Sequence, residues 1–132
     1  MKILFICKHN RFRSKVAEAL FKKYNKNKKI KAGSAGTNLD YIPVAENVIK
    51  VLKTFGVKKI NRKPKKISKK LINNSDLIII VADNVKKNIF KEYKKKIIVW
   101  KISDTSQDNY KGILKRTGLI KKKVRNFIKT PK

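Results

Sequence analysis

The sequence predicts an α/β fold of three layers, in which a four-stranded parallel sheet is flanked by helices. Four short apolar runs have the length and continuity of strands that are covered on both faces, at residues 2–7, 29–34, 76–83 and 96–102. The segments between and after these runs carry apolar residues at helical spacing. No repeat or linker divides the chain, so we expect one domain over residues 1–132.

The first three elements are expected to be a strand, a helix and a second strand. Residues 2–7 read KILFIC, a continuous apolar run. Over residues 14–25 the apolar side chains recur at helical spacing, which predicts a helix. Residues 29–34 are expected to form the next strand. A helical connection favours a parallel arrangement of the two strands.

The rest of the chain continues the alternation of helices and strands. Small and polar residues predict a loop over 33–42, and a helix follows over 44–55, where Gly56 ends it. We then expect a short charged helix, a buried strand, a helix, a strand and a final helix, over residues 63–74, 76–83, 84–93, 96–102 and 113–127.

The net charge of +29 arises from 37 basic and only 8 acidic residues. Nearly all of the basic residues are lysines, and they are spread along the whole chain. Aromatic residues do not alternate with them, as a base-stacking surface would require. We therefore expect a solvated coat of lysines, which attracts anionic substrates and binds polyanions weakly and in a salt-sensitive way.

Targeting and redox features point to the cytoplasm. No apolar stretch approaches the roughly 20 residues that span a bilayer, so no membrane partner is expected. The apolar N-terminus is short and lacks a cleavage site, which favours a strand over a signal peptide. A single cysteine cannot form an internal disulfide, and a reducing compartment is the expected location.

One motif carries chemistry: Cys7 is followed by five residues and then by Arg13 and Ser14. A thiolate is a strong nucleophile, and the N-terminus of the following helix favours negative charge. The five residues between Cys7 and Arg13 are expected to curl so that their backbone N–H groups surround an oxyanion: Lys8, His9, Asn10, Arg11 and Phe12. The guanidinium of Arg13 can bind two oxygens of that anion, and Ser14 can cap the helix and donate to the Cys7 sulfur. The simpler alternative is that Cys7 is a buried residue at a strand end.

The segment ILFICKHNRFRSKVAEALF resembles the N-terminus of the low-molecular-weight protein tyrosine phosphatases and of the arsenate reductases that share their fold. AGSAGT, FGV and SDLIIIVADN also match, so the resemblance covers most of the chain. It implies a phosphotyrosine protein phosphatase I-like fold, neither a metal nor an organic cofactor, and a cysteinyl-phosphate intermediate.

The resemblance also implies roles for residues of the motif. Cys7 would be the nucleophile, Arg13 the oxyanion binder and Ser14 the partner of the thiolate, while Asn10 would brace the loop through its amide.

Two residues depart from the family pattern. His9 stands where the family usually has a small residue, which alters the loop backbone or its ligand contacts. Phe12 stands where many members have a second cysteine, so a disulfide within the loop is impossible here. His9 is the single histidine, and we expect it to face solvent. The shortage of histidine and cysteine excludes a catalytic triad and a zinc site.

Breaking a phosphate ester requires a proton donor for the leaving oxygen. The family uses an aspartate in the loop before the last helix, usually followed by proline. Asp104 matches best in spacing from the preceding strand, although Thr105 replaces the proline. Asp108, close to Tyr110, is the alternative, and it would otherwise cap the last helix. Asp83 ends a strand at the ligand-binding edge of the sheet, but we expect it to cap the helix that follows.

The leading hypothesis is a phosphatase that acts on a phosphorylated protein or a small aryl phosphate. Tyr41 and Tyr110 lie in loops that are expected to rim the pocket, and two roles are open for them: stacking on an aromatic leaving group, or an ordinary place on the surface. A second hypothesis is arsenate reduction with an external small thiol, since Cys7 has no second cysteine to pair with. A third is a protein that binds phosphate or polyanions without turnover.

Overall fold

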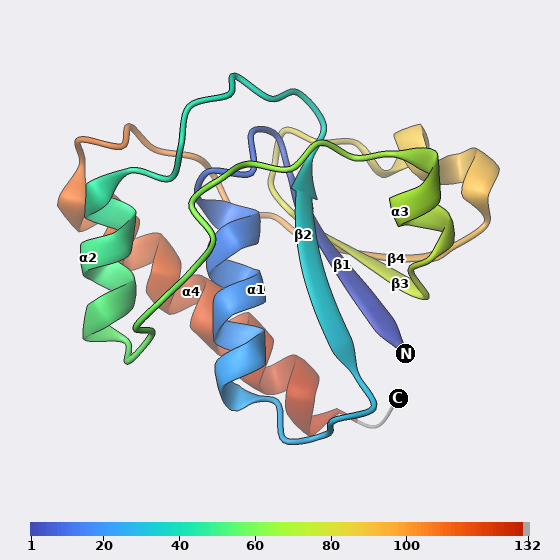
Figure 1. Cartoon of the computed structure of the whole chain (residues 1–132), viewed down its shortest axis with the longest axis horizontal. Coiled ribbons are helices and arrows are strands. Elements are labelled where there is room, and N and C mark those ends of the chain that lie inside the picture. Colours follow the sequence, from blue (N-terminus) through green and yellow to red (C-terminus); the bar gives the residue numbers. More distant parts are fainter. Residues whose placement is uncertain (131–132) are drawn as a thin grey trace.

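Four parallel strands form the centre of the molecule, in the order β2-β1-β3-β4 (Figure 1). The computed structural model describes residues 1–130, and its strands are β1 (Lys2–Cys7), β2 (Lys31–Gly36), β3 (Leu77–Val81) and β4 (Lys96–Trp100). The expected four-stranded parallel sheet is confirmed. Because β1 lies between β2 and β3, Cys7 stands in the middle of the carboxyl edge of the sheet.

Helices cover both faces of the sheet, and the expected three layers are confirmed (Figure 1). The core on one face includes residues of three helices: α1 (Arg13–Tyr24), α4 (Tyr110–Lys129) and α2 (Glu46–Thr54), which packs against α4. The other face is covered by α3 (Lys69–Asn73) and by the 3-10 helix η1 (Lys87–Tyr93). Among residues 1–130, no helix has the length and apolar character needed to cross a membrane.

The alternation of side chains along β1 explains why both faces are buried. Ile3 and Phe5 point into the core beneath α1, whereas Leu4 and Ile6 belong to the smaller core on the other side. Successive residues of a strand point to opposite faces, so a strand buried on both sides is apolar throughout. This geometry is what the continuous run KILFIC encodes.

The second strand lies two residues later than the prediction and includes residues that we expected in a loop. Ala35 pairs with Ile6 and Gly36 with Cys7, which extends β2 to the edge of the sheet. A Cβ atom on Gly36 would lie 2.7 Å from the carbonyl oxygen of Lys8. The small residues of AGSAG therefore permit the loop after Cys7 to pack against the strand; they do not mark the end of the strand.

Most other elements differ from the prediction by at most two residues at each end, and three differ by more or in type. The helix expected over 63–74 is confined to α3, which begins where the Ser68 hydroxyl accepts a hydrogen bond from the Leu71 amide. The expected helix over 84–93 is the 3-10 helix η1. The last helix begins at Tyr110, three residues before the expected start. Its cap is Asn109, whose side chain accepts from the Gly112 amide, so the capping role suggested for Asp108 was wrong.

Candidate active site

The segment from Cys7, at the end of β1, to Ser14, at the start of α1, is named the 7–14 loop. It lies at the carboxyl edge of the sheet, next to the segments that follow β2, β3 and β4 (Figure 1). Ligands of parallel α/β sheets bind at this edge. The topology thus gathers four chain segments around one loop.

Cys7 lies at the base of this loop with its sulfur close to a hydroxyl. Its side chain is buried, and Sγ lies 2.9 Å from the Oγ of Ser14. The same Oγ accepts a hydrogen bond of 2.7 Å from the Asn10 side-chain amide. Because that N–H occupies one lone pair of Oγ, the hydroxyl hydrogen of Ser14 is available to the sulfur. Ser14 does not cap α1, whose N-cap is Phe12 without a side-chain cap bond.

Asn10 braces the loop from inside. Its backbone has φ 55°, in the left-handed region that asparagine tolerates better than most residues. Its amide group also donates to the Ser34 hydroxyl at 3.0 Å and accepts from the Lys65 backbone N–H at 2.9 Å. Ser34 in turn donates to Glu18 at 2.5 Å. These bonds connect the loop to β2, to the segment before α3 and to α1.

The guanidinium of Arg13 is held between the ends of β3 and β4. The side chain is almost fully buried and donates to the Ile102 carbonyl at 2.9 Å and to the Asn84 side chain at 3.1 Å. Two carboxylates flank it, Asp83 and Asp104, each with an oxygen 3.6 Å from a guanidinium nitrogen. A guanidinium has five N–H donors, so donors remain for an anion.

Asp83 therefore faces Arg13, and the expectation that it caps the next helix was wrong. That helix, η1, begins at Lys87 and has no side-chain cap. A residue just past the end of a parallel strand meets the ligand-binding edge of the sheet, and this position brings Asp83 to Arg13.

A small hollow of about 20 Å³ borders Cys7. A space of this size admits one small polar group. Its walls come from the 7–14 loop and from the loop after β4: Cys7, His9, Arg11, Phe12, Arg13, Asp104 and Gln107. Asp104 borders the hollow and Asp108 does not, although both precede α4. The hollow therefore combines a thiol, a guanidinium and a carboxylate.

His9 and Arg11 tie the 7–14 loop to residues 38–43. The Nδ1 atom of His9 lies 2.5 Å from the Asn38 carbonyl oxygen, and Arg11 donates from Nε to the Pro43 carbonyl at 3.2 Å. Arg11 also lies 3.9 Å from the Asp40 carboxylate. His9 is thus half-buried and engaged with a neighbouring loop, in contrast to the expected solvent-facing position.

Four residues expected to bind substrate contribute less to the hollow than the sequence suggests. The side chain of Phe12 is part of the core beneath α1, although it borders the hollow. Lys8 contributes its carbonyl oxygen to the Asn38 amide and does not line the hollow. Tyr41 is 74% exposed and Tyr110 is 38% exposed, and neither lines the hollow.

Sequence reasoning missed two polar residues of the site. Gln107 lines the hollow from a loop without any recognisable pattern, so no sequence signal marks it. Asn84 accepts a hydrogen bond from Arg13. Its place after Asp83 at a strand end was a usable signal. Among residues 1–130, no group of three or more His, Cys, Asp or Glu side chains is arranged to hold a metal ion.

Comparisons with known proteins agree with this geometry. A family model described as low molecular weight phosphotyrosine protein phosphatase matches residues 2–128. A search of curated proteins finds no match.

Solved structures share the fold over nearly the whole chain. A low molecular weight protein tyrosine phosphatase from T. tengcongensis is 22% identical, with 97% of each chain covered and a TM-score of 0.85. YwlE arginine phosphatase from Geobacillus stearothermophilus is 18% identical, with 96% of this chain and 90% of that chain covered and a TM-score of 0.83. An arsenate reductase from Archaeoglobus fulgidus DSM 4304 is 25% identical, with 97% and 99% covered and a TM-score of 0.76. From the match over residues 2–128, the chain belongs to the low molecular weight phosphotyrosine protein phosphatase family and is a phosphatase of that type.

Proposed function

We propose that the protein hydrolyses a phosphate monoester, such as phosphotyrosine or a small aryl phosphate, with Cys7 as the nucleophile. The observation that carries the proposal is the arrangement at the hollow, which Cys7, Arg13 and Asp104 line together and where the Cys7 sulfur lies 2.9 Å from the Ser14 hydroxyl. Because the nucleophile is a free thiol, we place the activity in a reducing compartment such as the cytoplasm.

In the first step the phosphoryl group enters the 7–14 loop, where backbone N–H groups and Arg13 bind its oxygens. The Cys7 thiolate attacks phosphorus, so that a sulfur–phosphorus bond forms while the bond to the leaving oxygen breaks. Asp104, in its protonated form, gives its proton to that oxygen. The product of this step is a cysteinyl phosphate and a free alcohol or phenol.

In the second step a water molecule attacks the phosphorus of the cysteinyl phosphate. The carboxylate of Asp104 accepts a proton from this water, the sulfur–phosphorus bond breaks, and inorganic phosphate leaves. The Ser14 hydroxyl stabilises the departing thiolate. Asp83 and Asn10 act as positioning residues, since they hold Arg13 and the loop.

Two observations bear on the choice of substrate and proton donor. Asp104 borders the hollow while Asp108 does not, which supports Asp104 as the general acid. The aromatic residues proposed to stack on the leaving group, Tyr41 and Tyr110, lie outside the hollow. We therefore assign recognition of the phosphoryl group to the 7–14 loop. We assign contact with a protein substrate to the exposed Tyr41, which lies in the segment 38–43 that is hydrogen-bonded to Arg11.

Arsenate reduction is the second candidate, because a structural neighbour with 25% identity is an arsenate reductase. Arsenate has nearly the same shape as phosphate. Cys7 would attack arsenate and displace water. Since Cys7 is the only cysteine, an external small thiol would then attack the Cys7 sulfur, so that the sulfur–arsenic bond breaks, arsenite leaves and a mixed disulfide forms; a second small thiol would reduce this disulfide and restore Cys7. Arsenate-dependent consumption of a small thiol without phosphatase activity would favour this candidate.

The test is hydrolysis of p-nitrophenyl phosphate and of phenyl phosphate by wild type, Cys7→Ser, Asp104→Asn and the matched control Asp108→Asn. We expect no activity from Cys7→Ser. Loss of a general acid lowers kcat about 10²–10⁴-fold, so Asp104→Asn should lose activity in this range, most of all on phenyl phosphate with its more basic leaving group. Asp108→Asn should stay close to wild type.

Wild-type activity no higher than that of Cys7→Ser would overturn the proposed hydrolysis. A larger loss in Asp108→Asn than in Asp104→Asn would instead reassign the proton donor. Phosphotyrosine and phosphoarginine are the substrates to compare next, because one structural neighbour is an arginine phosphatase.

A further inference from the structure

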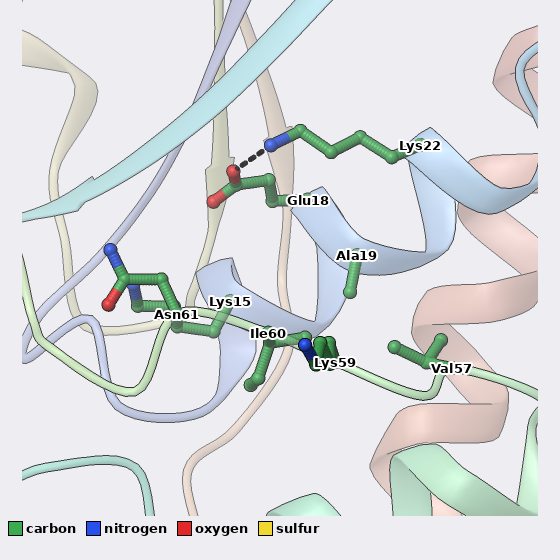
Figure 2. A pocket seen from close by; sticks show the side chains of 8 residues that line it. All are labelled: Lys15, Glu18, Ala19, Lys22, Val57, Lys59, Ile60 and Asn61. Atoms are coloured by element: carbon green, nitrogen blue, oxygen red, sulfur yellow. Dashed lines mark hydrogen bonds and ion pairs between the residues drawn. The ribbon is translucent and has the colours of Figure 1, made fainter.

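A second cavity, of about 220 Å³, lies beside α1 and shares no lining residue with the hollow that borders Cys7. Helix α1 forms one wall, and the segment 57–61 after α2 forms the other (Figure 2). We name this space the α1 cavity. It is about ten times as large as the hollow and has room for a small organic molecule.

Lys15 is an unusual lining residue because it is a buried lysine. Its side chain is 6% exposed, and its amine donates one hydrogen bond of 2.9 Å to the Lys63 carbonyl. An ammonium group has three N–H donors, and residues 1–130 provide this one acceptor for Lys15. Burial is the main cause that lowers the pKa of Lys15. The negative charge of Glu18 raises this pKa, and the positive charges of Lys65 and Lys22 lower it further. A nearby anion would satisfy the remaining donors and stabilise the charged amine.

The charges around the cavity favour an anion. Lys22 and Lys59 also line it, and both are exposed at its edge. Glu18 is the single carboxylate of the lining, and its oxygens are already engaged, one with the Lys22 amine at 2.6 Å and one with the Ser34 hydroxyl at 2.5 Å. Figure 2 shows the pairing of Glu18 with Lys22 along α1. Because Lys22 neutralises Glu18, Lys15 and Lys59 are the two amines of the lining that no carboxylate of the lining pairs with.

The remaining wall is apolar. Ala19 projects from α1 and lies across from Val57 and Ile60, and all three side chains are half-buried (Figure 2). Sites for small molecules commonly combine an apolar surface with a few convergent polar groups. A purely inorganic ion would leave this apolar wall without a partner.

We propose that the α1 cavity binds a small organic anion, whose charged group contacts Lys15 and Lys59 and whose apolar body packs against Ala19, Val57 and Ile60. The proposal concerns binding only, so it stands or falls independently of the phosphatase activity.

The test uses 2-naphthoate as the probe and its neutral amide, naphthalene-2-carboxamide, as the matched ligand. Backbone ¹H–¹⁵N spectra of the whole chain are recorded with saturating inorganic phosphate, which keeps the 7–14 loop occupied. We expect saturable shift changes in α1 around Ala19 and in residues 57–61. The amide should bind about tenfold or more weakly, because it loses the charged hydrogen bonds.

Three variants locate the site. Lys15→Met removes the buried amine and should weaken 2-naphthoate binding about tenfold. Lys70→Met, on α3, makes the same change of charge outside the cavity and should leave the affinity unchanged. Ala19→Phe fills the cavity without changing any charge and should abolish binding, which keeps the test decisive if Lys15→Met fails to fold.

Three outcomes would overturn the proposal. The first is the absence of saturable shifts at the cavity, and the second is equal affinity for the carboxylate and the amide. The third is binding that survives Ala19→Phe or falls as much in Lys70→Met as in Lys15→Met.

Discussion

The hydroxyl of Ser14 lies between two groups that determine its orientation. The Asn10 amide donates to its oxygen at 2.7 Å, and the Cys7 sulfur lies 2.9 Å away on the other side. When Cys7 is a thiolate it has no hydrogen to give, so the hydroxyl is the donor in this contact. At the scale of single residues, the site depends on this chain of oriented hydrogen bonds as well as on charge.

Replacing Ser14 with alanine should slow the second chemical step. A hydrogen bond to a charged group contributes about 1.5–3 kcal/mol, so we expect kcat to fall about 10–100-fold. The first turnover of p-nitrophenyl phosphate should then appear as a burst, since the cysteinyl phosphate accumulates. Ser68→Ala, which removes the hydroxyl that caps α3, is the control and should leave kcat unchanged. An unaltered kcat in Ser14→Ala would contradict the role of the hydroxyl.

Asn10 stabilises the loop in two ways, through its side-chain hydrogen bonds and through its left-handed backbone conformation. Two substitutions separate these two contributions to the free energy of unfolding. Asn10→Gly keeps the φ of 55° accessible but removes the side-chain bonds to Ser14, Ser34 and Lys65, which leaves buried polar groups unpaired at a cost of about 1–3 kcal/mol. Asn10→Ala should cost about 1–2 kcal/mol more, because alanine is strained in this region. Urea unfolding measures both, and equal stability of the two variants would show that the backbone conformation is not retained.

At the scale of elements, β2 and the 7–14 loop fit together because one position has no side chain. A Cβ on Gly36 would lie 2.7 Å from the Lys8 carbonyl oxygen and 2.9 Å from the Asn10 amide nitrogen. Both are backbone atoms of the loop, so the loop itself would have to move. Gly33, on the same strand, would place its Cβ 3.9 Å from the flexible end of Lys2, which is an ordinary contact.

Gly36→Ala should therefore distort the loop, and Gly33→Ala should not. We expect Gly36→Ala to lower the free energy of unfolding by about 1–3 kcal/mol, as overpacking does, and to lower kcat/KM on p-nitrophenyl phosphate at least about tenfold. Gly33→Ala is the control for an added methyl group in β2 and should retain wild-type activity. Equal activities of the two variants would mean that the loop does not require this close approach.

At the scale of the whole molecule, carboxylates are few and three of them lie beside the 7–14 loop. Of the eight acidic residues, Asp83 and Asp104 flank Arg13, and Asp40 lies near Arg11. The rest of the surface is dominated by lysine, which gives the molecule a positive field that attracts anions. The carboxylates orient the arginines of the loop within that field.

The buried Lys15 should make stability depend on pH in a definite direction. Its pKa is lowered from 10.5 in the folded protein, chiefly by burial. Between the lowered value and 10.5 the unfolded chain keeps a proton that the folded protein has lost, so this residue adds stability as pH rises through that window.

The measurement is the free energy of unfolding of wild type minus that of Lys15→Met. We expect this difference to be larger at about pH 10 than at about pH 7. Lys70 is exposed, and Lys70→Met is the control. The free energy of unfolding of wild type minus that of Lys70→Met should not increase between these two pH values. A difference that falls with pH would show that the amine is stabilised as an ion in the folded protein.

Local patterns in the chain determined the type and order of most elements. The run KILFIC, the helical spacing after it and the Cys7–Arg13–Ser14 motif at their junction were sufficient to predict the parallel sheet and the place of the candidate site. These patterns depend on the spacing of apolar residues and on the chemistry of residues close together in the chain. Both can be read from the sequence alone.

Contacts between distant segments were decided only by the tertiary structure. Arg13 meets Asp83 and Asp104 because the ends of β3 and β4 lie beside the 7–14 loop, whereas Tyr41 and Tyr110 lie outside the hollow. Periodicity says which face of an element is buried, but the direction of a loop depends on how whole elements pack. For this reason the cysteine, the arginine and Asp104 as a candidate proton donor were visible in the sequence, while the contacts of Asp83 and Asp104 with Arg13 and the α1 cavity required the folded chain.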